Sequence, residues 1–138
     1  MNESGFRSYF REFAPEFILL EPLSTFESSA VAQEMTEKLL REHPDLKGLY
    51  VAGGGISGAL TALRADDNSQ RLVTVGYQLM ENTRAALLDG LLTVVISYPL
   101  ARIGDEVVSG MIKAVSRQSE NRTFTSVLPF EIHTRENI

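Results

Sequence analysis

Residues 46–63, LKGLYVAGGGISGALTAL, constrain the fold of this chain more than any other stretch. An apolar run over residues 48–52 leads into three consecutive glycines, and a segment rich in small apolar residues follows. This order predicts a buried strand, a tight turn and a helix over residues 56–65. Ligands of open parallel α/β sheets bind in the crevice above strand ends of this kind, so the turn also marks a candidate site.

The same strand-then-helix pattern recurs along the rest of the chain. Strands are predicted over residues 17–20, 48–52, 71–77 and 91–98, helices over 5–13, 24–43, 56–65, 81–89 and 99–117, and a last extended segment over 126–134. Strict alternation of strands and helices predicts an α/β fold with a parallel sheet and helices on both of its faces. The 138 residues suffice for one such domain, over residues 1–138.

Two of the predicted helices carry specific local signals. Ser24 and Glu27 match a capping box, in which Ser24 begins the helix and Glu27 bonds back to it. The helix over residues 99–117 has an apolar stripe that we expect to be buried. The stripe consists of Ile103, Val107, Val108, Met111, Ile112 and Val115.

Charge and composition exclude several classes of function. The formal net charge of −5 argues against a nucleic-acid-binding surface on these residues. The chain has no cysteine, which excludes disulfides, thiolate metal sites and cysteine nucleophiles. The only histidines, His43 and His133, lack metal-binding spacing and are interpreted as structural, so we expect no metal site, no cofactor and no enzyme. No apolar run is long enough to cross a membrane and the N-terminus lacks the apolar region of a signal peptide, so we expect a cytoplasmic protein.

The glycine run itself satisfies the pattern G-x-G-x-x-G over residues 53–58. After a strand and before a helix, this pattern is typical of a backbone cradle for the pyrophosphate of a dinucleotide. Such a site also needs an acidic residue at the end of the next strand, where this chain has Gly76, Tyr77 and Gln78. We therefore favour the interpretation as a plain tight turn and keep nucleotide binding as an alternative.

Polar residues follow each predicted strand, and in a parallel sheet these strand ends converge on one edge. The candidate ligand-binding residues at this edge are Ala52, Gly53, Gly54, Tyr77, Gln78, Ser97 and Tyr98. Together they offer backbone N–H groups, an amide, two phenols and a hydroxyl, a set suited to a neutral polar ligand such as a sugar. The alternative that Tyr77 and Tyr98 only cover the core stays open on these residues alone.

Four segments, in order along nearly the whole chain, resemble effector domains of the lac-repressor (LacI/GalR) family. Residues 5–7, GFR, resemble the start of the second lobe of those domains, and residues 43–50, HPDLKGLY, resemble its helix-to-strand entry. Residues 73–77, VTVGY, are similar to the family's VVGF strand. Residues 128–137, LPFEIHTREN, resemble its LP-x-x-x-x-x-R-E ending.

The resemblance implies one lobe of a type I periplasmic-binding-protein-like fold, in which two lobes close over a small effector, commonly a sugar. The family's DNA-binding helix-turn-helix and first lobe lie outside these 138 residues, so DNA is a partner only through a domain absent here. The family also dimerises partly through this lobe, which makes residues 81–89 and the following strand a candidate dimer surface. A solute-binding protein of a transporter would share the architecture, and an enzyme with a nucleotide-binding sheet is the third alternative.

The resemblance carries over to the site by position, whereas the residue types differ. Gly53 and Gly54 stand where the family usually has Asn-Asp, Gln78 where it has Asp, and Tyr98 where it often has Gln. These differences imply a less anionic site, which we expect to suit a ligand with fewer hydroxyl donors.

Overall fold

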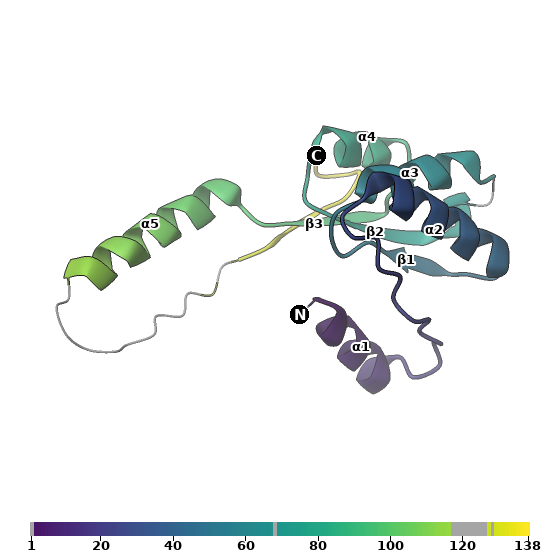
Figure 1. Cartoon of the computed structure of the whole chain (residues 1–138), viewed down its shortest axis with the longest axis horizontal. Helices are drawn as coiled ribbons and strands as arrows, with labels where there is room; N and C mark the ends of the chain where they lie inside the picture. Colours follow the sequence, from purple (N-terminus) through teal and green to yellow (C-terminus); the bar gives the residue numbers. More distant parts are fainter. Residues whose placement is uncertain (1, 68, 117–126, 128) are drawn as a thin grey trace.

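The computed structural model describes residues 2–67, 69–116, 127 and 129–138, and it places a four-stranded sheet beneath a layer of helices (Figure 1). The helices are α1 (Asn2–Phe13), α2 (Ser29–Glu42), α3 (Ile56–Ala65), α4 (Glu81–Leu88) and α5 (Leu100–Ser116), with a 3-10 turn η1 (Ser69–Arg71). The strands are β1 (Gly48–Tyr50), β2 (Val73–Tyr77), β3 (Val94–Ser97) and β4 (Glu131–His133). The helix predicted over 56–65 is confirmed with the same bounds. The strands predicted over 48–52, 71–77 and 91–98 are present but shorter than predicted.

The strands lie in the order β1-β2-β3-β4, and the predicted mainly parallel sheet is confirmed. β1, β2 and β3 run parallel, whereas β4 pairs antiparallel with β3. The register sets Tyr50 beside Val75 and Tyr77 beside Ile96. Because β1, β2 and β3 are parallel, their carboxyl ends meet at a single edge of the sheet, as the sequence predicts.

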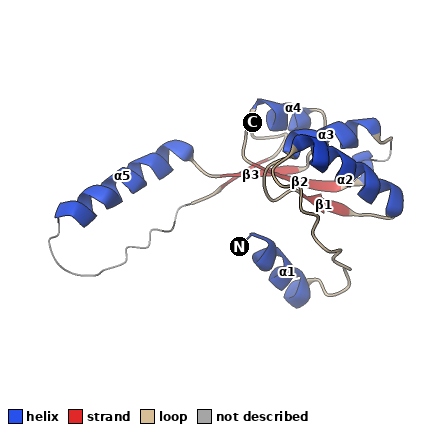
Figure 2. Ribbon diagram, in the orientation of Figure 1, coloured by secondary structure: helices blue, strands red, loops and turns tan. Residues whose placement is uncertain are grey.

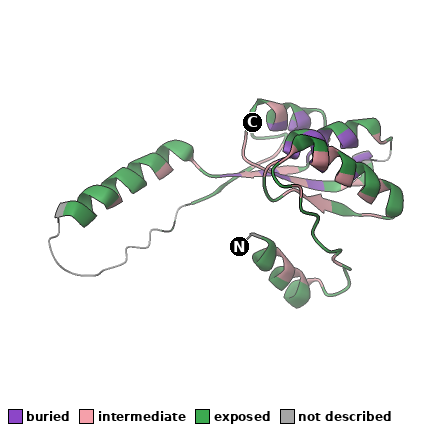
Figure 3. Cartoon of the chain, viewed as in Figure 1, coloured by how far each residue is buried: buried purple, intermediate pink, exposed green. Residues whose placement is uncertain are grey.

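The core lies between the sheet and α3 with α4. Leu60 and Leu63 of α3, Leu87 of α4 and Val95 of β3 are at most 1% exposed and belong to one apolar cluster. Figure 3 shows the buried residues gathered in this layer. The outer helix α2 packs on α3, where Gly58 allows the two backbones to approach closely.

Among the described helices, α1 is the one that lies on the opposite side of the sheet, near β1 (Figure 2). Phe6 of α1 stacks on Tyr50 of β1 with 5.1 Å between ring centroids. Over β3 and β4 no described helix lies on this face, and Ile132 is 52% exposed there. The predicted helices on both faces are therefore present, although the second layer covers only the β1 side.

The apolar stripe of the last helix is not buried, so that prediction is wrong for the described chain. Met111 is 64% exposed and Val115 is 81% exposed. Figure 1 shows α5 projecting away from the sheet and its covering helices. The 3.6-residue periodicity correctly predicted an amphipathic helix, but periodicity cannot say whether a surface lies opposite the apolar face.

Two local predictions near the N-terminus are also wrong. Residues 17–20 form no strand. Phe17 instead packs edge-on against Phe10 of α1, and the Leu20 carbonyl accepts a hydrogen bond from Arg7. An apolar run becomes a strand only beside another strand, and within the described chain β1 pairs with β2 alone.

The helix that follows begins four residues later than the capping box predicted, with its N-cap at Ser28 instead of Ser24 and its first helical residue at Ser29. Ser28 is the N-cap, and its side chain accepts a hydrogen bond from the Val31 amide at 3.4 Å. Phe26 and Glu27 have φ angles of 50° and 59°, which lie in the left-handed region and cannot continue a right-handed helix. The helix predicted to reach residue 117 is described as far as Ser116, and residue 117 lies outside the described residues, as do positions 126 and 128 of the last extended segment.

Candidate functional site

The carboxyl edge of the sheet carries three tyrosines, one at the end of each parallel strand. Tyr50 ends β1, Tyr77 ends β2, and Tyr98 follows β3 directly. The rings of Tyr77 and Tyr98 meet edge to face, with centroids 5.6 Å apart and planes at 77°. The sheet register places Tyr50 and Tyr77 on the face that α1 covers in part. We call these three residues the tyrosine edge.

Tyr50 is the member of the tyrosine edge that sequence reasoning missed. Burial raises the pKa of its phenol above the ordinary value of 10.0, and the neighbouring Tyr98 raises it further. Tyr50 therefore carries its proton at neutral pH and can donate a hydrogen bond. The strand predicted over residues 48–52 places Tyr50 in its middle, so Tyr50 is not among the strand ends that the sequence predicts.

The raised pKa of Tyr50 makes stability depend on pH in the alkaline range. The folded state binds the Tyr50 proton more tightly than the unfolded chain does. The contribution of this proton to the free energy of unfolding is therefore complete below about pH 10 and is lost as pH rises through the folded pKa. We expect the urea midpoint to fall as pH rises above about 10, and we expect Tyr50→Phe to remove part of this fall. Tyr9→Phe, at a residue that is 60% exposed on α1, serves as the control and should leave the pH dependence unchanged. Identical pH profiles for Tyr50→Phe and the native chain would contradict the assignment.

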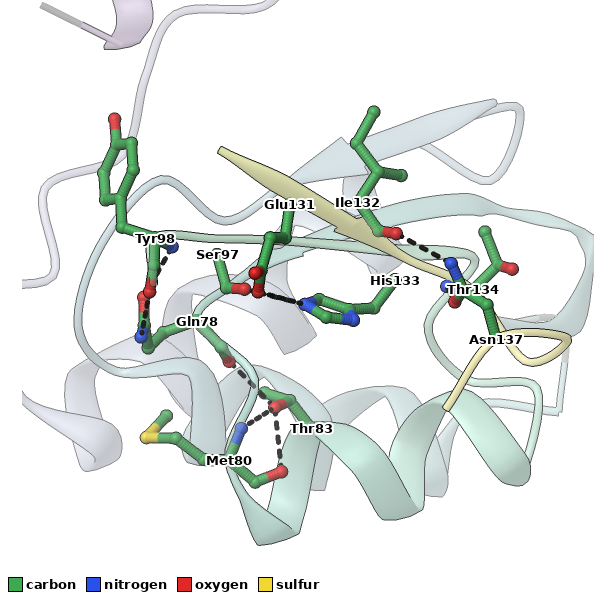
Figure 4. Close-up of polar contacts among 10 residues, drawn as sticks. All are labelled: Gln78, Met80, Thr83, Ser97, Tyr98, Glu131, Ile132, His133, Thr134 and Asn137. Carbon is green, nitrogen blue, oxygen red and sulfur yellow. Dashed lines mark hydrogen bonds and ion pairs between the residues drawn. The ribbon is translucent and has the colours of Figure 1, made fainter. Parts of the chain in front are cut away.

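Gln78 holds the two neighbouring strand ends together (Figure 4). Its side-chain amide donates to the Tyr98 carbonyl and its Oε1 accepts from the Tyr98 amide, both at 3.5 Å. Its backbone carbonyl accepts from the Thr83 hydroxyl at 2.9 Å, which ties it to the start of α4. The amide expected to contact a ligand is thus already engaged with the backbone of the tyrosine edge and orients Tyr98.

Ser97 lies at the same edge, but its side chain is buried and points to the α4 side of the sheet. Its Oγ lies 2.7 Å from Nε2 of His133, and the Glu131 carboxylate lies 3.5 Å from the same nitrogen (Figure 4). A nucleophilic serine needs its histidine oriented by an acid on the other ring nitrogen. Here both neighbours share Nε2, so this arrangement stabilises the pairing of β3 with β4 and lacks the geometry of a catalytic triad.

Three glycines of the run over residues 53–58, namely Gly54, Gly55 and Gly58, are required by local packing or backbone conformation. A Cβ on Gly54 would lie 1.7 Å from the Glu27 carboxylate, and one on Gly58 would lie 1.8 Å from the Ser29 carbonyl oxygen. Gly55 caps α3 with a φ of 84°, in the left-handed region. The space that a phosphate would need beside Gly54 is occupied by an anionic side chain. This geometry favours the tight-turn interpretation over a dinucleotide cradle.

Backbone strain gathers at this edge. Among the described residues, the non-glycine positions with positive φ are Phe26, Glu27 and Gln78. Glu27 contacts the turn after β1, and Gln78 follows β2, so all three lie in loops at the carboxyl edge. Residues held in this region cost of order 1–3 kcal/mol each and cluster at binding sites. Glu27 is therefore a second candidate site residue that sequence reasoning missed, because the sequence assigned it to a capping box.

The remaining predicted site residues are backbone contributors. Ala52 and Gly53 are exposed, and Gly54 is half-buried against Glu27. Within the described ranges no group of three His, Asp or Glu side chains is arranged to hold a metal ion. In the same ranges no helix combines the length and apolar character needed to span a bilayer.

Comparison with known proteins identifies the fold. No model of a protein family and no curated protein matches the chain. A solute-binding protein of an ABC transporter from Agrobacterium vitis, solved with D-fucose, superposes on 97% of this chain with a TM-score of 0.83 and 20% identity. The chain has the fold of one lobe of a type I periplasmic binding protein. This agrees with the fold that the resemblance implies.

Two further solved structures share this type I binding-protein fold. A second Agrobacterium vitis solute-binding protein, bound to α-D-tagatopyranose, gives a TM-score of 0.85 over 98% of this chain at 20% identity. A periplasmic solute-binding protein from Actinobacillus succinogenes, with D-allose, gives 0.80 over 97% at 16% identity. The chain spans 46%, 45% and 47% of the length of these three proteins, respectively, so it corresponds to about half of each.

Proposed function

We propose that this chain binds a neutral monosaccharide at the tyrosine edge, as the effector-binding lobe of a LacI-type transcription regulator. The observation that carries the proposal is the convergence of Tyr50, Tyr77 and Tyr98 at the carboxyl edge of a type I binding-protein lobe. Ligands of open α/β sheets bind at this edge. Solved proteins that share the fold were crystallised with monosaccharides, which supports the class of ligand.

The chemistry of the edge suits a sugar. Aromatic rings offer flat apolar surfaces for the C–H faces of a pyranose, and phenols exchange hydrogen bonds with its hydroxyls. The Glu27 carboxylate, seated against Gly54 at the same edge, is an acceptor for a ligand hydroxyl. No catalytic group is needed for binding, so the proposal includes no enzymatic step.

The regulator role draws its support from the sequence resemblance to the LacI/GalR family. In such a protein, effector binding shifts the population between two arrangements of the lobes and thereby changes the spacing of the DNA-binding heads. The DNA contacts belong to a helix-turn-helix outside these 138 residues, and the protein acts in the cytoplasm as a homodimer.

A transport role is the second candidate, because the solved proteins with this fold include solute-binding proteins of ABC transporters. Both roles use the same lobe and the same ligand class. The encoded sequence that precedes Met1 separates them. A helix-turn-helix followed by a first lobe supports the regulator, whereas a signal peptide followed by a first lobe supports transport.

Calorimetric titration of the chain with D-fucose, D-tagatose, D-allose and NAD tests the binding proposal. We expect heat of binding with at least one sugar and none with NAD. Tyr98→Ala should weaken the sugar affinity about tenfold, because it removes one ring of the edge and about 1.4 kcal/mol of contact. Tyr9→Ala, which removes an exposed ring on α1 away from the edge, is the matched control and should bind as the native chain does. Binding of NAD without binding of any sugar would overturn the proposal in favour of the nucleotide alternative.

A further inference from the structure

A turn of unfavourable backbone conformation precedes α2. The Ser28 amide donates to the Thr25 carbonyl at 2.9 Å, and the two central residues, Phe26 and Glu27, have φ angles of 50° and 59°. Positive φ at both central positions is typical of a type I′ turn, which favours asparagine followed by glycine. Both central residues are exposed, so burial in the core does not account for their presence here. Backbone strain of this kind is tolerated where a side chain has a functional role.

The Glu27 carboxylate lies over the glycine turn between β1 and α3. A Cβ built on Gly54 would overlap Oε2 of Glu27, and one built on Gly53 would lie 3.2 Å from Oε1. The carboxylate therefore rests on two residues that have no side chain of their own. Gly55 is the N-cap of α3, and the N-terminus of a helix attracts negative charge. Glu27 thus occupies the position that an anionic group of a ligand would take at such a turn.

The loops at this edge contain no basic side chain to balance the carboxylate. Lysine and arginine are absent from the loop before α2 and from the loops that follow β1, β2 and β3, which are residues 14–28, 51–55, 78–80 and 98–99. Arg7 of α1 reaches the loop before α2, but it forms ion pairs with Glu3 and Glu21. Among the described residues, none forms a hydrogen bond or an ion pair with the Glu27 carboxylate. Its oxygens are therefore available to accept hydrogen bonds from a ligand.

We propose that Glu27 determines the charge of the ligands that the site accepts, so that neutral sugars bind and sugars with a phosphate or a carboxylate are excluded. This selectivity rests on the proposed function, because Gly53 follows Tyr50 by three residues and lies at the same edge of the sheet. A carboxylate can accept hydrogen bonds from two adjacent hydroxyls of a neutral sugar, and a charged acceptor makes such bonds stronger. A ligand anion at the same position meets a like charge, and no cation of these loops offsets the repulsion.

Calorimetric titration with three matched pairs of ligands tests the selectivity. D-fucose and D-galacturonate differ only at the last carbon, which is a methyl group in the first and a carboxylate in the second. The other pairs are D-tagatose and D-allose, each with its 6-phosphate. We expect the native chain to bind the neutral member of a pair about tenfold more tightly than the anionic member. Glu27→Gln keeps the size and one acceptor oxygen but removes the charge, so we expect it to bring this ratio to about one.

Glu34→Gln is the matched control, because it removes the same charge from an exposed position on α2. This variant should keep the selectivity of the native chain. Equal binding of both members of a pair by the native chain, or a ratio that Glu27→Gln leaves unchanged, would overturn the role of Glu27 and leave the proposed function standing. A native chain that binds no neutral sugar would overturn the proposed function, and the selectivity with it.

The substitution Glu27→Gly tests the strained turn without any ligand. Glycine adopts a φ of 59° without strain, so we expect the urea midpoint of this variant to rise. Glu34→Gly makes the same change inside α2, where glycine is disfavoured, and should lower the midpoint. A lower or unchanged midpoint for Glu27→Gly would assign the Glu27 side chain a structural role and contradict the proposal. Because this measurement involves no sugar, its failure is distinguishable from a failure of the proposed function.

Discussion

Gly58→Ala is expected to destabilise the fold by about 3 kcal/mol or more. A Cβ at this position would lie 1.8 Å from the Ser29 carbonyl oxygen, 2.7 Å from its carbon and 2.9 Å from the Gln33 amide nitrogen. All three neighbours are backbone atoms of α2, so no side-chain rotation can relieve the clash. The helices must separate, which opens the contact between α2 and α3. Urea unfolding followed by circular dichroism measures the loss.

Gly104→Ala is the matched control for this substitution. Gly104 also lies within a helix, but no atom lies within 4 Å of a Cβ built there. Alanine in a helix is favoured over glycine by about 0.5–1 kcal/mol, so this variant should be as stable as the native chain or slightly more so. Equal unfolding midpoints for Gly58→Ala and the native chain would contradict the close approach of α2 and α3.

The second large effect is expected for Leu87→Ala, with a loss of about 3 kcal/mol in the free energy of unfolding. The Leu87 side chain is fully buried and belongs to the apolar cluster between α4, α3 and the sheet. Truncation removes its buried methyl groups and leaves a cavity whose walls are held by Leu60 and Val95. The lowered urea midpoint at an unchanged slope would identify the change as one of stability.

The neighbouring Leu88→Ala provides a control with the same chemical change. Leu88 is 50% exposed on the outer side of α4, so truncation there leaves no cavity and should cost less than about 1 kcal/mol. Comparable losses from Leu87→Ala and Leu88→Ala would mean that α4 does not pack in the orientation described.

The candidate site shows how far strand ends can be predicted from sequence. The chemistry of Tyr77, Gln78 and Tyr98 was accessible, because parallel strands bring consecutive strand ends to one edge whatever their exact register. The roles of the Gln78 and Ser97 side chains could not be predicted from the sequence. Gln78 binds the backbone of Tyr98, and Ser97 turns toward His133 on the other face of the sheet. One residue of register decides which face a side chain occupies, and the sequence does not specify that register.

The glycine run illustrates the same division. Its place between a strand and a helix was evident from composition, whereas the reason for each glycine was not. Gly54 accommodates Glu27, and Gly58 accommodates Ser29. Both contacts join segments that are remote in sequence, so a motif search finds only the pattern that they share with dinucleotide sites.

The sequence by itself determined the order of strands and helices, the parallel sheet and the edge at which strand ends meet, because hydrophobic periodicity and turn residues act over a few positions. Only the tertiary structure decided that residues 17–20 form no strand, that Ser28 caps α2, that Tyr50 lies at the carboxyl edge of the sheet and that the apolar stripe of α5 is exposed. Each of these outcomes depends on which other segments of the folded chain pack against the residues concerned. A periodic pattern shows that a face is apolar, and only the packed molecule shows what that face meets.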